Sequence, residues 1–168
     1  SIPFSVKSPY LVSQNNITIT QNLLELARLK KVKKFIQLST SEVYGSGKIF
    51  PMSETHPLNP QSPYAASKVA TDSMAMSYYY TYNVPVTILR PFNTFGPRQS
   101  QRAIIPTIIV QILQGKKTIN LGSLHTYRDF NFVEDTSEAI IRLASNPKTL
   151  GETYNIASNY YIQIKDIV

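Results

Sequence analysis

Cysteine and tryptophan are both absent from this chain of 168 residues. The lack of cysteine excludes disulfides, thiolate zinc sites, iron–sulfur clusters and a cysteine nucleophile. The only histidines are His56 and His125, too few for a metal cage built from histidines, so we expect no metal site. No stretch approaches the roughly 20 apolar residues of a membrane span. We therefore expect a protein of a reducing, cytoplasmic setting that has no membrane partner.

Acidic residues are also scarce, because 10 Asp and Glu stand against 17 Lys and Arg, which gives a formal charge of +7. Such an excess favours anionic partners. Five of the cations gather between Arg28 and Lys34, after an apolar helical pattern. Positive charge suits the last turn of a helix, and no aromatic residue interleaves with these cations to form a surface for nucleic acid. We interpret the run as a solvated helix end and expect no nucleic-acid partner.

Helical and strand patterns alternate along the chain. They predict helices over 16–29, 63–82, 104–113 and 136–144, strands over 35–39, 84–90 and 153–157, and short strands over 118–121 and 128–133. The alternation predicts an α/β fold with parallel strands. The sequence begins without methionine and stops within a helical pattern that starts at 163, so we expect a fragment of a longer protein.

Hydroxyl and carboxylate side chains follow the first expected strand, at Thr40, Ser41 and Glu42. Ligands of open α/β sheets lie beyond the carboxyl ends of the strands. Two hydroxyls and a carboxylate at that place would supply a hydrogen-bond donor and a general base. A capped turn is the alternative interpretation of the same triplet.

Tyr64 and Lys68 lie four residues apart on the expected Ala-rich helix, so both side chains share one face. An ammonium beside a phenol favours the phenolate and lowers the pKa of the tyrosine from about 10. A tyrosine with such a pKa can take a proton from a sugar hydroxyl. A surface pair without a function is the alternative.

A third polar cluster begins at Arg90, again at the end of a strand. Asn93 and Arg98 in this cluster, and Arg128 further on, are candidates for binding phosphate or sugar. The planar guanidinium of arginine fits phosphate oxygens. Each of these residues taken alone is also ordinary in loops.

Taken in this order, the clusters resemble the extended short-chain dehydrogenase/reductase family, in particular its NAD-dependent nucleotide-sugar epimerases and dehydratases. The matching segments are Ser39–Gly45, Pro60–Lys68, Leu89–Arg98, Arg128–Asp135 and Gly151–Asn155. The resemblance implies the C-terminal part of a Rossmann-like parallel sheet with helices on both faces, plus part of a small substrate-binding α/β region. It assigns residues 1–99 to the Rossmann-like domain, to which 128–150 return in part. It assigns 100–168 mainly to an incomplete nucleotide-sugar-binding region.

The resemblance also implies roles for single residues. Tyr64 would be the catalytic base, and Lys68 would be its partner and hold the nicotinamide ribose of NAD. Thr40 would hydrogen-bond the sugar 4-hydroxyl. The residues expected to lie near the cofactor also include Asn16, Pro91 and Phe92, and those expected to bind the nucleotide-diphosphate sugar are Asn93, Arg98 and Arg128.

Glu42 indicates a 4,6-dehydratase within this family. In such enzymes hydride leaves sugar C4 for NAD, a glutamate at this place removes the C5 proton, water leaves from C6 and hydride returns to C6. Ser41, a candidate for the acid, matches mannose-type dehydratases and glucuronate decarboxylases, whereas 59–64 looks more like bacterial dehydratases of UDP-N-acetylglucosamine. A nucleotide-sugar 4-epimerase and a UDP-glucuronate decarboxylase stay open as alternatives.

The Gly-rich turn that cradles the cofactor pyrophosphate in this family has no match in the sequence. The chain has only six glycines, and none of them forms such a turn between a strand and a helix. We therefore expect poor NAD binding by these residues alone. A non-catalytic remnant that binds sugar nucleotides or dimerises is the alternative from another class. The family also implies a homodimer formed through helices 16–29 and 64–82.

Overall fold

The computed structural model describes residues 2–168. Its elements are α1 (Ile2–Lys7), α2 (Pro9–Lys30), β1 (Phe35–Leu38), the 3-10 helix η1 (Ser41–Tyr44), α3 (Pro63–Tyr82), β2 (Val86–Pro91), β3 (Asn93–Phe95), α4 (Ile104–Leu113), β4 (Tyr127–Phe132), α5 (Val133–Ser145), η2 (Pro147–Thr149), β5 (Thr153–Ile156), β6 (Tyr161–Gln163) and η3 (Ile164–Asp166). None of the helices in this range combines the length and apolar character needed to cross a membrane.

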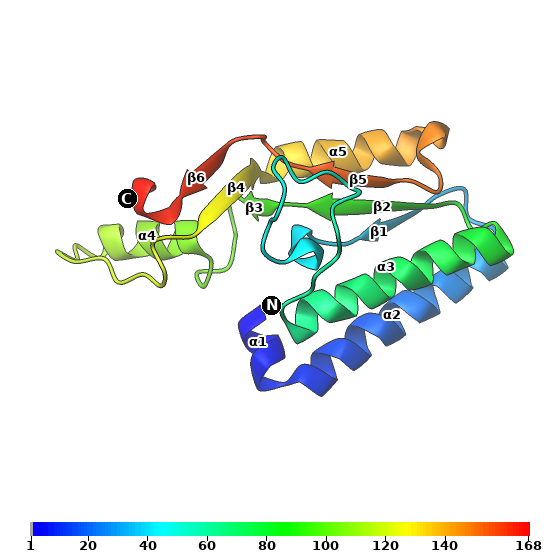
Figure 1. Cartoon of the computed structure of the whole chain (residues 1–168), viewed down its shortest axis with the longest axis horizontal. Helices are drawn as coiled ribbons and strands as arrows, with labels where there is room; N and C mark the ends of the chain where they lie inside the picture. Colours follow the sequence, from blue (N-terminus) through cyan, green and yellow to red (C-terminus); the bar gives the residue numbers. More distant parts are fainter. Residues whose placement is uncertain (1) are drawn as a thin grey trace.

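Two small sheets lie end to end (Figure 1). The first has the order β1-β2-β5 with all strands parallel, and helices α2 and α3 lie on one face of it while α5 lies on the other. The second has the order β3-β4-β6, in which β3 and β4 are parallel and β4 and β6 antiparallel. Within residues 2–168, β1 pairs with β2 only, so its other edge ends the sheet. The predicted α/β fold, with parallel strands and helices on both faces, is confirmed.

The main hydrophobic core fills the space between the first sheet and the helix pair α2–α3. Its buried residues are Leu24, Ala27, Ala75, Val84, Val86 and Ile88. Each strand of this sheet is short, and β2 in its centre is buried along residues 86–90. The core therefore fixes α3 along the sheet, with its first turn near the carboxyl ends of the strands (Figure 1).

The two long helices begin and end where local signals and tertiary contacts place them. Helix α3 spans the predicted residues, because Ser62 caps it, Pro63 occupies its first turn and Asn83 at φ 57° ends it. Helix α2 begins at Pro9, seven residues before the expected start at 16. The additional turns pack against α1, which itself contacts α3.

Some expected strands are absent or shorter in the structure. Residues 118–121 form no strand, because the Gln111 side chain bonds both backbone groups of Asn120, at 3.0 Å to the oxygen and 2.9 Å to the nitrogen. The strand expected from 84 begins at Val86, since Pro85 has no N–H for the ladder. The expected helix from 163 is a single 3-10 turn, η3. Strands β3 and β6 were not predicted.

Candidate active site

The triplet Thr40–Glu42 leads into η1 at the carboxyl end of β1. The Thr40 hydroxyl accepts a hydrogen bond from the Glu42 N–H at 3.3 Å, and the turn ends at Gly45 with φ +64°. A Cβ at Gly45 would lie 2.1 Å from the Asn59 carbonyl oxygen, so the turn requires glycine. Thr40, Ser41 and Glu42 are all half-buried. The triplet is thus a capped turn that also holds its polar side chains at the strand end.

Tyr64 lies in the first turn of α3, where the Ser62 hydroxyl accepts a hydrogen bond from the Ala65 N–H at 3.1 Å. Its phenol lies close enough to the Thr40 hydroxyl and the Glu42 carboxylate for both to influence its pKa, since α3 packs against η1. The fold therefore brings together Tyr64, Thr40 and Glu42, which the sequence predicted as candidates from two separate segments.

The pKa of Tyr64 is raised above its ordinary value, opposite to the predicted direction. Burial of the phenol is the largest cause, and the negative charge of Glu42 adds to it, while the nearby Thr40 hydroxyl opposes both. Lys68 does not lower this pKa, because its ammonium donates to the Leu38 carbonyl oxygen at the end of β1. The shared face of Tyr64 and Lys68 is present, but the predicted charge effect is wrong.

Lys68 lies near a buried carboxylate that sequence reasoning missed. Burial lowers the pKa of Lys68, and Asp72, one turn further along α3, opposes that shift. Asp72 Oδ2 accepts hydrogen bonds from Ser39 Oγ at 2.8 Å and from Arg90 Nε at 3.1 Å. The available signal was an acidic residue at the i+4 position from Lys68 in an apolar helix.

Asn16 connects α2 to the turn of α3 that carries Tyr64. Its Nδ2 donates to Ser67 Oγ at 2.8 Å, and Ser67 Oγ donates to the Tyr64 carbonyl oxygen at 2.7 Å. Asn16 thus lies beside the site as expected and supports the backbone of Tyr64. Its contact with a cofactor stays a prediction.

The residues after β2 lie at the same carboxyl edge. Pro91 ends β2 and Asn93 begins β3, and both are half-buried, as is Phe92 between them. Asn93 lines a cavity of about 150 Å³, whose other lining residues are Thr94, Gln99, Ala103, Ile104, Ile105 and Phe130. This segment therefore lies at the carboxyl end of β2, and its predicted contacts with cofactor and substrate stay predictions.

The two candidate arginines, Arg98 and Arg128, make no polar contact with Tyr64 or Thr40 in residues 2–168. Arg98 is exposed and has φ 67°, and Arg128 donates from Nη1 to the carbonyl oxygen of its neighbour Tyr127 at 2.8 Å. Arg128 shares β4 with Phe130, the residue opposite Asn93, so it lies near the cavity. Over residues 2–168, no hydrogen bond or ion pair joins either arginine to Tyr64 or Thr40.

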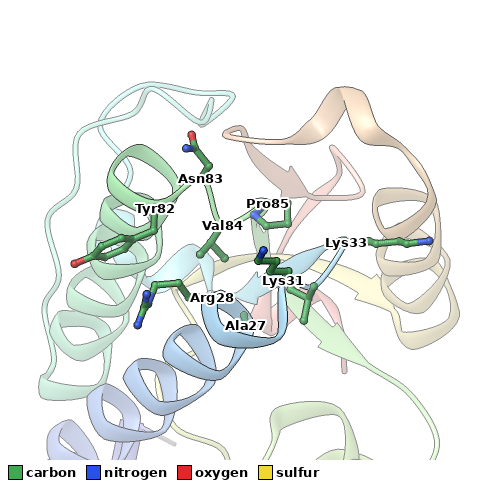
Figure 2. A pocket seen from close by; sticks show the side chains of 9 residues that line it. Ala27, Arg28, Lys31, Lys33, Tyr82, Asn83, Val84 and Pro85 are labelled. Atoms are coloured by element: carbon green, nitrogen blue, oxygen red, sulfur yellow. The ribbon is translucent and has the colours of Figure 1, made fainter.

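A larger cavity of about 320 Å³ lies at the opposite end of the sheet (Figure 2). It is lined by Ala27, Arg28, Lys31, Val32, Lys33, Tyr82, Asn83, Val84 and Pro85. Tyr82 ends α3 whereas Tyr64 begins it, and the helical rise separates them by about 27 Å. Since this cavity lies at the amino ends of the strands, it is not the site formed by the candidate residues.

Comparison with known proteins identifies the family. The sequence profile described as GDP-mannose 4,6 dehydratase matches residues 1–168. The chain belongs to the GDP-mannose 4,6-dehydratase family. Among curated relatives, the dTDP-D-glucose 4,6-dehydratase of Dictyostelium discoideum is 34% identical over 97% of this chain and 40% of its own length. The dTDP-glucose 4,6-dehydratase of Actinoplanes sp. is 36% identical, with 90% of this chain and 47% of the relative covered.

Solved structures confirm the Rossmann-like family fold. The UDP-N-acetylglucosamine 4-epimerase from Methanobrevibacter ruminantium, in complex with UDP-N-acetylmuramic acid, has a TM-score of 0.92 and 33% identity over 99% of this chain and 55% of that one. The dTDP-glucose 4,6-dehydratase of Streptomyces venezuelae with NAD bound has a TM-score of 0.92 and 31% identity over 99% and 52%. The chain thus spans about half the length of these members of the dehydratase and epimerase family.

The residues of this chain suit the nicotinamide ribose of the family's cofactor, but its glycines do not suit the pyrophosphate. Tyr64 and Lys68 in α3 offer hydrogen-bond donors, as the ribose of a nicotinamide cofactor would need. Pro91 and Phe92 at the carboxyl end of β2 offer an apolar surface, as the nicotinamide ring would need. Glycines, in contrast, serve packing: at Gly45, Gly47, Gly96 and Gly151 an added Cβ would meet protein atoms at 2.1 to 2.6 Å. None of these four offers an open backbone surface for a pyrophosphate.

Proposed function

We propose that the protein to which these residues belong catalyses the NAD-dependent 4,6-dehydration of a nucleotide-diphosphate hexose. The observation that carries this proposal is the meeting of Tyr64, Thr40 and Glu42 at the carboxyl end of β1. A phenol, a hydroxyl and a carboxylate at one edge suit the two proton abstractions that this reaction needs. The similarity to two dTDP-glucose 4,6-dehydratases supports the reaction class.

Each side chain has one task in this proposal. The Thr40 hydroxyl orients the sugar 4-hydroxyl, and Tyr64 takes the proton of that hydroxyl. Glu42 then removes the C5 proton, which a ketone at C4 acidifies, and Ser41 supports departure of the 6-hydroxyl as water. NAD, when bound, supplies the acceptor and later the donor of hydride. Lys68 would hold its nicotinamide ribose.

The remaining candidate residues divide between cofactor and substrate. Asn16 fixes the turn of α3 that carries Tyr64, and Pro91 with Phe92 would face the nicotinamide. Those proposed for the nucleotide-diphosphate sugar are Asn93, Arg98 and Arg128. We keep the proposed division of the chain into residues 1–99, joined in part by 128–150, as the Rossmann-like portion, and 100–168 as mainly sugar-nucleotide-binding.

Product analysis tests the proposed reaction. The protein as its gene encodes it is incubated with NAD and, separately, with UDP-N-acetylglucosamine, dTDP-glucose and GDP-mannose, and products are analysed by NMR and mass spectrometry. A 4-keto-6-deoxy sugar nucleotide supports dehydration. Recovery of a C4 epimer with no loss of water from any of the three rejects it.

The variant Glu42→Gln separates the two halves of the reaction. It should stop loss of water yet leave C4 oxidation detectable as absorbance of reduced cofactor, because Tyr64 and Thr40 are intact. Glu134→Gln, which removes an exposed carboxylate in the first turn of α5, is the matched control and should keep wild-type turnover. Unchanged dehydration by Glu42→Gln would show that the carboxylate has no part in it.

A 4-epimerase is the second candidate, because a UDP-N-acetylglucosamine 4-epimerase matches the fold with a TM-score of 0.92. A 4-epimerase needs oxidation at C4 but no proton removal at C5. Under this alternative Glu42→Gln would keep its activity, and the product would have the mass of the substrate. The same two measurements therefore discriminate between the candidates.

A homodimer through α2 and α3 is proposed as well. The outward face of α2 is apolar at i, i+4 and i+7 positions, through Ile19, Leu23 and Leu26, each about half-exposed. Leu26→Lys should convert a dimer into a monomer in sedimentation velocity, and a monomeric wild-type protein would refute this assembly. A cytoplasmic location and a role in polysaccharide biosynthesis stay predictions from the sequence.

A further inference from the structure

A buried polar network lies beneath the candidate site and connects five elements. Asp72 of α3 accepts from Ser39 at the end of β1 and from Arg90 of β2, at 2.8 and 3.1 Å. Arg90 Nη1 also donates to Tyr44 Oη at 3.0 Å, and Tyr44 Oη donates to Asn155 Oδ1 at 2.7 Å. The network therefore joins α3, β1, β2, η1 and β5 directly behind the catalytic candidates.

Asp72 is unusual within this network. It is only 3% exposed, and although Oδ2 accepts two hydrogen bonds, Oδ1 has no hydrogen-bond partner among residues 2–168. Burying such a group is costly unless nearby positive charge compensates it. Arg90 supplies one such charge on Oδ2, and Lys68, one turn earlier on α3, supplies the second.

Lys68 and Asp72 also hold the same short stretch of backbone. The Lys68 ammonium donates to the Leu38 carbonyl oxygen, and the next residue, Ser39, donates to Asp72. Helix α3 is thus joined to β1 at two consecutive residues, immediately before Thr40. Any displacement of Asp72 would move the strand end that presents Thr40 to Tyr64.

We propose that Asp72 is a positioning residue of the site: through Ser39 its buried carboxylate holds the end of β1 in place beside Tyr64, and its charge favours the ammonium form of Lys68. The inference deepens the proposed function, because it concerns the residue proposed to hold the nicotinamide ribose. A bare ion pair with Arg90 would serve stability alone, whereas the i+4 spacing on α3 also brings the charge of Lys68 within the influence of Asp72.

The charged and titratable groups around Lys68 are few. Helix α3 contributes Asp72 and, one turn earlier, Tyr64, and β1 contributes the backbone carbonyl of Leu38; among residues 2–168, Asp72 is the charged group that acts on Lys68. Burial disfavours the ammonium, and Asp72 is the group that opposes this effect by raising the pKa of Lys68. Removal of the Asp72 charge should therefore make Lys68 lose its proton at a lower pH.

Competitive acylation with acetic anhydride measures this directly, since only the free amine reacts. The protein as its gene encodes it is labelled at a series of pH values from about 7 to about 11, and mass spectrometry measures the modification of each lysine at each pH. Asp72→Asn should lower the titration midpoint of Lys68, with about tenfold more free amine at a pH below the midpoint. Lys34, whose ammonium bonds Asn146 and Thr149 at the far end of β1, is the internal reference and should not change.

Thr71→Val is the matched control variant. Thr71 is the buried neighbour of Asp72 and accepts a hydrogen bond from Gln37 at 3.1 Å, so its loss perturbs the same turn of α3 without changing a charge. It should leave the Lys68 midpoint in place. A purely structural role for Asp72 predicts equal behaviour of the two variants, and an unchanged Lys68 midpoint in Asp72→Asn overturns the proposal.

Asp72→Asn leaves Arg90 buried without its carboxylate, which can prevent folding. If it does, the double variant Asp72→Asn/Arg90→Gln removes both buried charges, and the same lowered Lys68 midpoint is expected from it. A wild-type midpoint in the folded double variant refutes the proposal. Because the labelling needs no turnover, a protein that fails to dehydrate any sugar nucleotide would refute the proposed function and leave this result intact.

Discussion

Replacing Gly45 with alanine tests how closely the turn after η1 approaches the segment that leads into α3. Gly45 has φ +64°, and an added Cβ would lie 2.1 Å from the Asn59 carbonyl oxygen and 3.2 Å from its carbon. These are backbone atoms, so no side-chain rotation relieves the contact. The Asn59 N–H also donates to the Val43 carbonyl oxygen at 2.9 Å, which holds the two segments together. The substitution must push them apart.

Two effects set the magnitude. Gly45 combines φ 64° with ψ −140°, a conformation that residues other than glycine rarely adopt, and another residue there costs about 1–3 kcal/mol. Relief of the contact needs a displacement of roughly 1 Å to restore van der Waals separation. That displacement breaks the hydrogen bond between Asn59 and Val43, with a net loss of about 1 kcal/mol. We therefore expect Gly45→Ala to lower the free energy of unfolding by about 2–4 kcal/mol.

Gly115→Ala is the matched control, because Gly115 has φ +68° and no atom lies within 4 Å of an added Cβ. It carries the conformational cost alone, about 1–2 kcal/mol. Urea unfolding measures the loss of unfolding free energy in each variant, provided that the dependence on urea concentration is unchanged. A larger loss for Gly45→Ala is expected, and equal losses would refute the reasoning that Asn59 makes this turn intolerant of a side chain.

Three further predictions concern other parts of the molecule. Gln111→Ala removes both hydrogen bonds to Asn120, and should lower the free energy of unfolding by about 1–3 kcal/mol and speed amide exchange at Asn120. Leu24→Ala opens a fully buried core position and should cost about 3–5 kcal/mol in urea unfolding; a loss below about 1 kcal/mol would contradict the packing. The raised pKa of Tyr64 means that its neutral form stabilises the fold below the ordinary pKa of about 10, and that this contribution is lost as pH rises through the higher folded-state value. Glu42→Gln should lower that pKa, seen as earlier ionisation of Tyr64 in ¹³C-tyrosine NMR, and an unchanged titration would contradict their proximity.

Local signals explain which elements could be predicted from the sequence. Ser62 and Pro63 define the start of α3, and the strand β1 follows from a short apolar run. The start of α2 was not predictable in this way, because residues 9–15 have little apolar periodicity and their helix depends on packing against α1. The segment 118–121 has the composition of a strand, yet the Gln111 side chain occupies its backbone groups.

The candidate site was predictable in its placement and only partly in its electrostatics. Three polar clusters follow strand ends in the sequence, and parallel strands gather those ends at one edge. The direction of the Tyr64 pKa was not predictable, since it depends on burial of the phenol. The Leu38 carbonyl was not predictable as the partner of the Lys68 ammonium, because it reaches Lys68 only in three dimensions, whereas the i+4 spacing of Asp72 was a signal in the sequence.

Within residues 2–168 one edge of β1 is unpaired, which has a consequence for these residues when they are studied by themselves in concentrated solution. A row of backbone N–H and C=O groups on such an edge can pair with a second copy, which is a route to aggregation. Lys31, Lys33 and Lys34 directly precede this strand. The strand is only about 13 Å long, so the exposed Lys31 and Lys33 lie within about one Debye length of its whole edge at 0.1 M salt. Repulsion between these cations should hold such edges apart, so the colloidal stability of residues 2–168 by themselves should fall as the ionic strength rises.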